Sequence, residues 1–133
     1  MHKILLIDDE PQIQKFLRIS LSSQQFEVLS AENGQKGIAM ALEQHPDLVI
    51  LDLGLPDLDG KHVLQRLIGE TRIPVVVLSV RANETEKVAC LNMGAHDYVV
   101  KPFSVNELLA RIRRTLALRG PSQPPQTLMF DDG

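Results

Sequence analysis

The sequence has a single cysteine, Cys90, which excludes an internal disulfide and is typical of proteins in a reducing cytoplasm. It has no large excess of one charge: the formal net charge is −3, which argues against a broad nucleic-acid or membrane surface. It also lacks an apolar run long enough to cross a membrane, and its N-terminus, MHKILLIDDE, meets charged residues too early for a signal peptide. We therefore expect a soluble protein that resides in the cytoplasm and makes no contact with a membrane.

The hydrophobic residues fall into short runs separated by segments with helical spacing. With 133 residues and 44% hydrophobic content, the chain is large enough for one domain with a proper core. Five runs read as strands: Lys3–Ile7, Phe26–Ser30, Leu48–Leu51, Pro74–Leu78 and Tyr98–Val100. The first, third and fourth runs are almost entirely Ile, Leu and Val, which indicates strands covered on both faces. The last helical segment is the clearest, and Ser104 with Glu107 gives it the pattern of a capping box.

This alternation of strand and helix, repeated five times, predicts an α/β fold. We expect a doubly wound, five-stranded parallel sheet in the order 2-1-3-4-5, with five helices and right-handed crossovers. Residues 1–119 should form this domain. From Gly120 the sequence GPSQPPQ has the composition of a linker, and residues 120–133 are expected to be that linker and the start of a further, missing domain.

Polar residues follow the predicted strands where each strand ends. Asp8 and Asp9 follow the first strand, Asp52 the third, Ser79 the fourth and Lys101 the fifth. In a parallel sheet these positions share the edge formed by the carboxyl ends of the strands, where ligands bind in open α/β sheets. The first and third strands should be neighbours, which would bring the three carboxylates together.

Three crowded carboxylates repel one another unless a cation lies among them, and an all-oxygen donor set of this kind suits Mg²⁺. Lys101 adds a positive charge and Ser79 a hydroxyl, so the edge could stabilise a phosphoryl group on Asp52 as the nucleophile. More ordinary interpretations stay open at this point. Asp52 could be a turn residue, and Asp8 or Asp9 could cap the helix that begins near Pro11.

The ordered set of motifs resembles the receiver domains of two-component response regulators over residues 3 to about 118. The matching segments are IDDE at 7–10, LDLGLPDLDG at 51–60, LS at 78–79, GAHDYVVKPF at 94–103 and NELLARIR at 106–113. The resemblance implies a flavodoxin-like (CheY-like) fold and Asp52 as the phosphoacceptor. It also implies roles for other residues: Mg²⁺ ligation by Asp8, Asp9, Asp52 and the Gly54 carbonyl, a switch hydroxyl at Ser79, a rotating aromatic at Tyr98, and a phosphate-contacting base at Lys101. The peptide bond between Lys101 and Pro102 would be cis.

Within this family, the Asp97–Tyr98 pair and the spacing of Glu107 and Arg111 resemble the OmpR/PhoB subfamily. That likeness implies a C-terminal winged-helix DNA-binding domain, which would be the chain's only route to DNA. It also implies a homodimer formed through helix four, strand five and helix five, with the pairs Lys87–Glu107 and Asp97–Arg111. Two residues depart from the subfamily pattern and put a third ion pair in doubt: His96 stands where an acid is usual and Leu118 where an arginine is usual. The segment LDLGLPDLDG at 51–60 most resembles the corresponding segment in regulators of potassium-transport genes.

The expected function is a signalling switch that a sensor histidine kinase phosphorylates on Asp52 with Mg²⁺ as cofactor. It would catalyse only its own phosphotransfer and hydrolysis, so it would not be an enzyme with a metabolic substrate. A dehalogenase-type phosphatase would need a DxD arrangement after the first strand, which this sequence does not have. A flavin-binding module is also disfavoured, because the acids after the first strand would repel the flavin's phosphate. An atypical receiver that dimerises without phosphate remains an alternative.

Overall fold

The computed structural model describes residues 1–119, so the predicted linker and further domain at 120–133 lie outside the described residues. Five parallel strands form one sheet in the order β2-β1-β3-β4-β5, which confirms the predicted topology. The strands are β1 (Lys3–Ile7), β2 (Glu27–Ala31), β3 (Leu48–Asp52), β4 (Val75–Ser79) and β5 (Asp97–Val100). The helices are α1 (Pro11–Ser22), α2 (Gly34–Gln44), α3 (Gly60–Glu70), α4 (Glu84–Met93) and α5 (Val105–Arg119).

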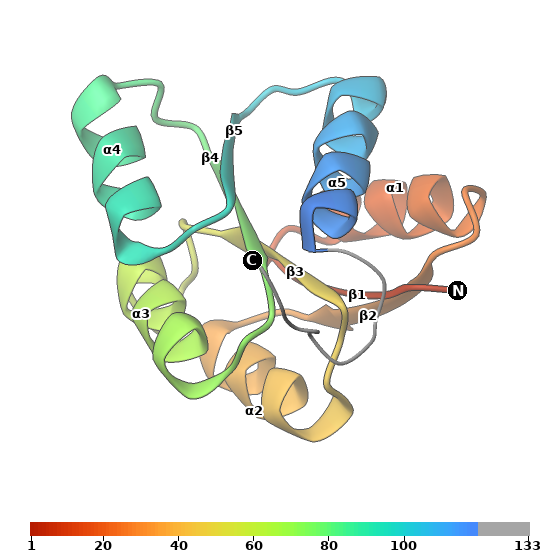
Figure 1. Ribbon diagram of the computed structural model, residues 1–133, viewed down its shortest axis with the longest axis horizontal. Coiled ribbons are helices and arrows are strands. Elements are labelled where there is room, and N and C mark those ends of the chain that lie inside the picture. The colour runs from red at the N-terminus through yellow and green to blue at the C-terminus, as the bar shows by residue number, and fades with distance from the viewer. Residues whose placement is uncertain (120–133) are drawn as a thin grey trace, which may run out of the picture.

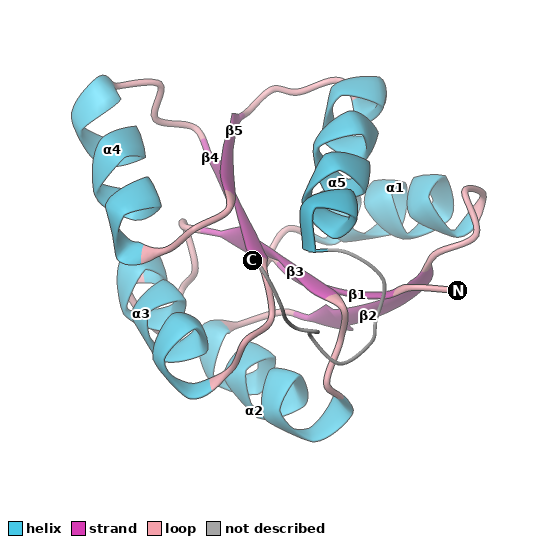
Figure 2. Cartoon of the chain, viewed as in Figure 1, coloured by secondary structure: helices cyan, strands magenta, loops and turns pink. Residues whose placement is uncertain are grey.

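The helices cover both faces of the sheet (Figures 1 and 2). One core cluster joins the sheet to α2, α3 and α4 through Ile38, Leu64 and Cys90, and a second joins the opposite face to α1 and α5 through Leu17 and Ile112. Every residue of β3 and β4 is buried, as their unbroken aliphatic sequences predicted. Among residues 1–119, no helix is long and apolar enough to pass through a bilayer.

Several predicted strand ends differ from the structure by one residue, and those at the carboxyl ends of β3 and β4 concern the site. Asp52 is the last residue of β3 rather than the residue after it, because it keeps the ladder register with Leu78. Ser79 likewise ends β4, where it is in register with Val100. Both polar side chains therefore start from rigid sheet backbone instead of from a loop.

Local signals fix the helix starts around this edge. Pro11 occupies the first turn of α1. At α5, the hydroxyl of Ser104 accepts a hydrogen bond of 3.0 Å from the backbone amide of Glu107, which is one half of the predicted capping box. The Lys101–Pro102 peptide bond is cis, as the family resemblance implied.

Candidate functional site

The carboxyl ends of β1, β3, β4 and β5 converge on one open pocket of about 720 Å³. Its walls hold five of the predicted site residues, namely Asp9, Asp52, Gly54, Ser79 and Lys101. The topology therefore brings together residues from four strand ends that are far apart in the sequence.

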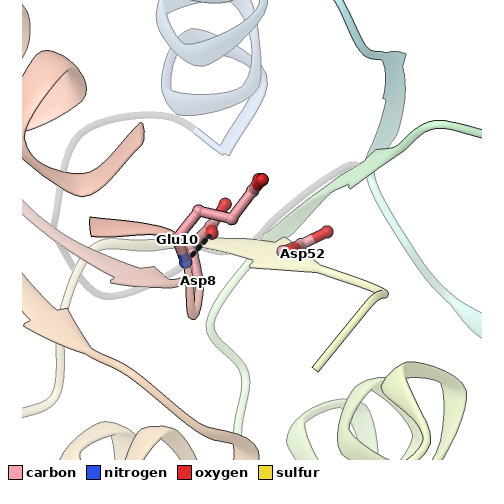
Figure 3. Close-up of side chains that lie close together, drawn as sticks. All are labelled: Asp8, Glu10 and Asp52. Atoms are coloured by element: carbon pink, nitrogen blue, oxygen red, sulfur yellow. Dashed lines mark hydrogen bonds between the residues drawn. The ribbon is translucent and has the colours of Figure 1, made fainter. Parts of the chain in front are cut away.

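Three carboxylates form a compact cluster at this pocket: Asp8, Glu10 and Asp52 (Figure 3). One oxygen from each lies within 4.8 Å of the others. Asp8 is fully buried and Asp52 nearly so, whereas Glu10 is exposed. Oxygen donors at this separation fit a divalent cation such as Mg²⁺.

Glu10 was not predicted as a member of this cluster. The chain turns after β1 so that the backbone amide of Glu10 donates to Asp8 Oδ1 at 2.8 Å, drawn as a dashed line in Figure 3. This turn folds the Glu10 side chain back toward Asp52. Asp9 is half-buried and lines the same pocket without belonging to the cluster, so its metal role stays a prediction. The sequence signal that could have identified Glu10 is its place as the third acid in the run Asp8-Asp9-Glu10.

Lys101 provides the positive charge that these acids need. Its Nζ lies 3.3 Å from Asp52, 3.4 Å from Asp8 and 3.2 Å from Glu10, and only 11% of its side chain is accessible to solvent. Burial lowers the pKa of the Lys101 ammonium, but the charges of Asp52 and Asp8 outweigh this, and the net pKa lies above its usual value. Lys101 is therefore a permanent cation at the centre of the site.

The position of Asp8 changes the pKa of its carboxyl group. Burial is the main cause, and it raises the pKa of the Asp8 carboxyl from 3.8 to about 6, with the Asp52 charge adding to the rise. The Glu10 amide and Lys101 act in the opposite direction and offset part of it. A cation bound among these acids would favour the ionised form of Asp8.

The two predicted switch residues are connected through the backbone of Arg81. The Arg81 amide donates to Ser79 Oγ at 3.0 Å, and the hydroxyl of Tyr98 donates to the Arg81 carbonyl at 2.8 Å. The ring of Tyr98 is buried, with 4% of the residue exposed. The loop between β4 and α4 thus holds both side chains in place.

The loop from Leu53 to Asp59 carries Gly54, whose carbonyl is a predicted metal ligand. The Gly54 amide donates to Asp52 Oδ1 at 3.2 Å. Farther along, the Asp57 carboxylate accepts hydrogen bonds from the Gly34 and Gln35 amides at 2.8 and 3.0 Å, at the start of α2. These amides hold the pKa of Asp57 below its ordinary value. The start of α2 thereby anchors the loop beside Asp52.

The predicted dimer residues lie on α4, β5 and α5, and three of them already form ion pairs within one chain. Arg111 Nη1 lies 2.8 Å from Asp97 Oδ1, and Arg111 Nη2 lies 3.5 Å from Glu107. Lys87 is exposed on α4. His96 and Leu118, the departures from the subfamily pattern, line a common hollow of about 190 Å³ with Arg72, Pro74 and Thr115.

Comparison with curated proteins identifies close relatives among transcriptional regulators. The chain is 50% identical over 113 residues to the transcriptional regulatory protein KdpE of Mycobacterium tuberculosis, a match that covers 85% of this chain and 50% of the relative. It is 42% identical over 133 residues to the KDP operon transcriptional regulatory protein KdpE of Escherichia coli, covering 99% of this chain and 59% of that protein. The chain thus spans about half the length of the curated relatives it matches.

Solved structures agree with this assignment. The BeF3-activated N-terminal receiver domain of Klebsiella pneumoniae RstA matches with a TM-score of 0.82 and 31% identity, covering 86% of this chain and 97% of that one. The Francisella response regulator 1452 receiver domain matches with a TM-score of 0.86 and 27% identity, covering 90% and 99%. The family model for the response regulator receiver domain matches residues 4–113. This chain therefore belongs to the response regulator receiver domain family, among homologues of KdpE.

Proposed function

We propose that this chain is the phosphorylation-activated receiver of a transcriptional regulator, with Asp52 as the phosphoacceptor. The observation that carries the proposal is the position of Asp52: it ends β3 inside the pocket, 3.3 Å from Lys101 and beside Asp8 and Glu10. A nucleophilic carboxylate faces a fixed cation here, and phosphoryl transfer depends mainly on such positioning and charge stabilisation.

In the proposed reaction, an oxygen of the Asp52 carboxylate attacks the phosphorus of a phosphohistidine on a sensor kinase. The bond between phosphorus and the histidine nitrogen breaks, and the imidazole leaves with the electron pair and takes up a proton. Lys101 and the hydroxyl of Ser79 would stabilise the charge on the phosphoryl oxygens. Mg²⁺ held by Asp8, Asp9, Asp52 and the Gly54 carbonyl, with Glu10 beside them, would supply further positive charge.

The relatives and the subfamily resemblance support a finer proposal about partners. A KdpD-type sensor histidine kinase would phosphorylate the chain in the cytoplasm, and a DNA-binding domain beyond it would control potassium-transport genes. The output is signalling, so the chain would catalyse only its own phosphotransfer and dephosphorylation. The names of the KdpE relatives and the receiver fold support this proposal.

The test is the intact mass of the protein after incubation with acetyl phosphate, with and without Mg²⁺, alongside Asp52→Asn. The expected result is a single phosphoryl adduct that requires both the metal and Asp52. A folded, Mg²⁺-binding protein that forms no adduct would instead favour the atypical receiver.

The proposed homodimer would form through α4, β5 and α5 after phosphorylation, with Lys87 of one protomer facing Glu107 of the other. Arg111 would then exchange its Asp97 partner within the chain for one across the interface. Sedimentation of the phosphorylated protein tests this through a charge swap. Lys87→Glu should weaken the dimer, and adding Glu107→Lys should restore it; no restoration would exclude this pair from the interface.

A further inference from the structure

Glu86 is a buried carboxylate that has no part in the site described so far. It lies in the first turn of α4 with 8% of its surface exposed. Its Oε1 atom lies 3.0 Å from Lys61 Nζ on α3 and 3.8 Å from Arg81 Nη1 in the loop between β4 and α4. The hydrogen bond and charge of Glu86 raise the pKa of Lys61. A buried charge needs such partners, so this cluster ties the start of α4 to two neighbouring elements.

All three members of the cluster line the same pocket as Asp52. A phosphoryl group on Asp52 would add negative charge and strong acceptor oxygens to this pocket. Lys61 and Arg81 are long side chains with 40% and 67% of their surfaces accessible, so both are free to reorient toward a new anion. Glu86 and the phosphoryl group would therefore compete for the same two cations.

Arg81 connects this competition to the predicted switch. The Arg81 amide donates a hydrogen bond to the Ser79 hydroxyl, and the Arg81 carbonyl accepts one from the Tyr98 hydroxyl. The Arg81 guanidinium faces the Glu86 carboxylate. A shift of Arg81 toward the phosphoryl group would act on both switch residues and on the start of α4. The next residue along α4 is Lys87, which belongs to the proposed dimer face.

We propose that Glu86 is a built-in competitor of the phosphoryl group, which holds Lys61 and Arg81 in the unphosphorylated protein and loses them when Asp52 is phosphorylated. The exchange would release the first turn of α4 and couple the pocket to the dimer face. This inference rests on the proposed function, because it presumes that Asp52 carries the phosphoryl group. By linkage, removing the Glu86 charge must strengthen binding of a phosphoryl mimic.

The test is the affinity for beryllofluoride with Mg²⁺, a mimic of the phosphoryl group, measured by calorimetry. Glu86→Gln keeps the shape of the side chain and removes its charge, and the dissociation constant should fall about three- to tenfold. Glu70→Gln is the matched control, because it removes the carboxylate from an ion pair with Arg66 at 2.7 Å on α3, away from the pocket lining, and should leave the affinity unchanged. Glu86→Asp keeps the charge but shortens its reach, so it should give an intermediate gain.

A double-mutant cycle separates charge competition from a packing effect. In a background with Lys61→Met and Arg81→Met, the gain from Glu86→Gln should disappear, since there is no cation left to release.

The chain has one tyrosine and no tryptophan, so its intrinsic fluorescence emission reports Tyr98 and gives a second readout of switching. Unchanged or weaker binding by Glu86→Gln, or a gain that persists without the two cations, would overturn the inference. If the wild-type protein forms a phosphoryl adduct on Asp52 in the same preparations, the proposed function survives that failure.

Discussion

The ammonium nitrogen of Lys101 lies 3.3 Å from the carboxylate of Asp52, although the two residues belong to the ends of strands that β4 separates. The same nitrogen contacts Asp8 and Glu10, so one cation holds three acids together. We therefore expect Lys101 to act in two ways: it should stabilise the metal-free fold, and it should compete with Mg²⁺ for the same carboxylates.

Replacement of Lys101 with methionine should separate these two effects. The Lys101→Met variant should lose about 1–3 kcal/mol in its free energy of unfolding in EDTA, because the buried acids lose their counter-ion. Saturating Mg²⁺ should then stabilise the variant more than it stabilises the wild type, since the cation no longer competes with an ammonium. Urea denaturation with and without Mg²⁺ measures both quantities. Lys36→Met, which removes an exposed ion pair with Glu32 at the start of α2, should change neither.

The raised pKa of Asp8 predicts a specific pH dependence of stability without metal. The folded protein keeps the Asp8 proton up to a pKa of about 6, while the unfolded chain releases it near 3.8, so ionisation of Asp8 costs stability as the pH rises through this window. The Asp8→Asn variant should be more stable than wild type by about 3 kcal/mol above pH 6.5, and the difference should vanish below about pH 4. Urea denaturation in EDTA across this range measures it.

Asp57→Asn supplies the contrast to that experiment, because the pKa of Asp57 is lowered rather than raised. Its contribution to stability is present above the unfolded pKa and is lost as the pH falls through the folded pKa. The Asp57→Asn variant should therefore be less stable than wild type at neutral pH, and the difference should shrink in acid. Equal pH profiles of stability for Asp8→Asn and Asp57→Asn would contradict the opposite pKa shifts of these two carboxyl groups.

Much of this site follows from the sequence because parallel topology leaves little choice. Once five aliphatic runs alternate with helices, the ends of β1, β3 and β5 must share an edge, and Asp8, Asp52 and Lys101 converge there. No detail of side-chain packing is needed for that step. The one-residue errors at Asp52 and Ser79 arose because a polar side chain at a strand end does not interrupt the backbone ladder.

The contacts that sequence reasoning missed depend on backbone turns and on partners from distant elements. Glu10 joins the acids only because its amide folds back onto Asp8. Glu86 looks like an ordinary first-turn helix acid, and its burial depends on Lys61 and Arg81, which come from other segments. No local pattern encodes such a cluster. Residue spacing likewise did not predict that Arg111 pairs with Asp97 within one chain.

The anchoring of the loop by Asp57 predicts an effect on metal binding at a distance. Asp57→Ala removes the two hydrogen bonds to the start of α2 and should weaken Mg²⁺ binding about two- to fivefold, because the Gly54 carbonyl loses its fixed position. Asn33→Ala is the matched control: it removes the side chain that caps the same helix by accepting from the Lys36 amide, but it does not touch the loop. Calorimetric titration with Mg²⁺ should show weaker binding only for Asp57→Ala.

Two glycines of α3 should respond to alanine in opposite directions. A Cβ on Gly60 would lie 2.4 Å from the Cα of Leu53 and 2.6 Å from its carbonyl oxygen, so the backbone next to Asp52 would have to move. Gly60→Ala should therefore destabilise the protein by about 2–3 kcal/mol and also weaken Mg²⁺ binding. A Cβ on Gly69 meets nothing within 4 Å, so Gly69→Ala should stabilise by about 0.5–1 kcal/mol through helix propensity and leave the metal affinity unchanged. Denaturation and Mg²⁺ titration of both variants decide this, and a Gly60→Ala protein that matched wild type in both would show that Leu53 yields without disturbing Asp52.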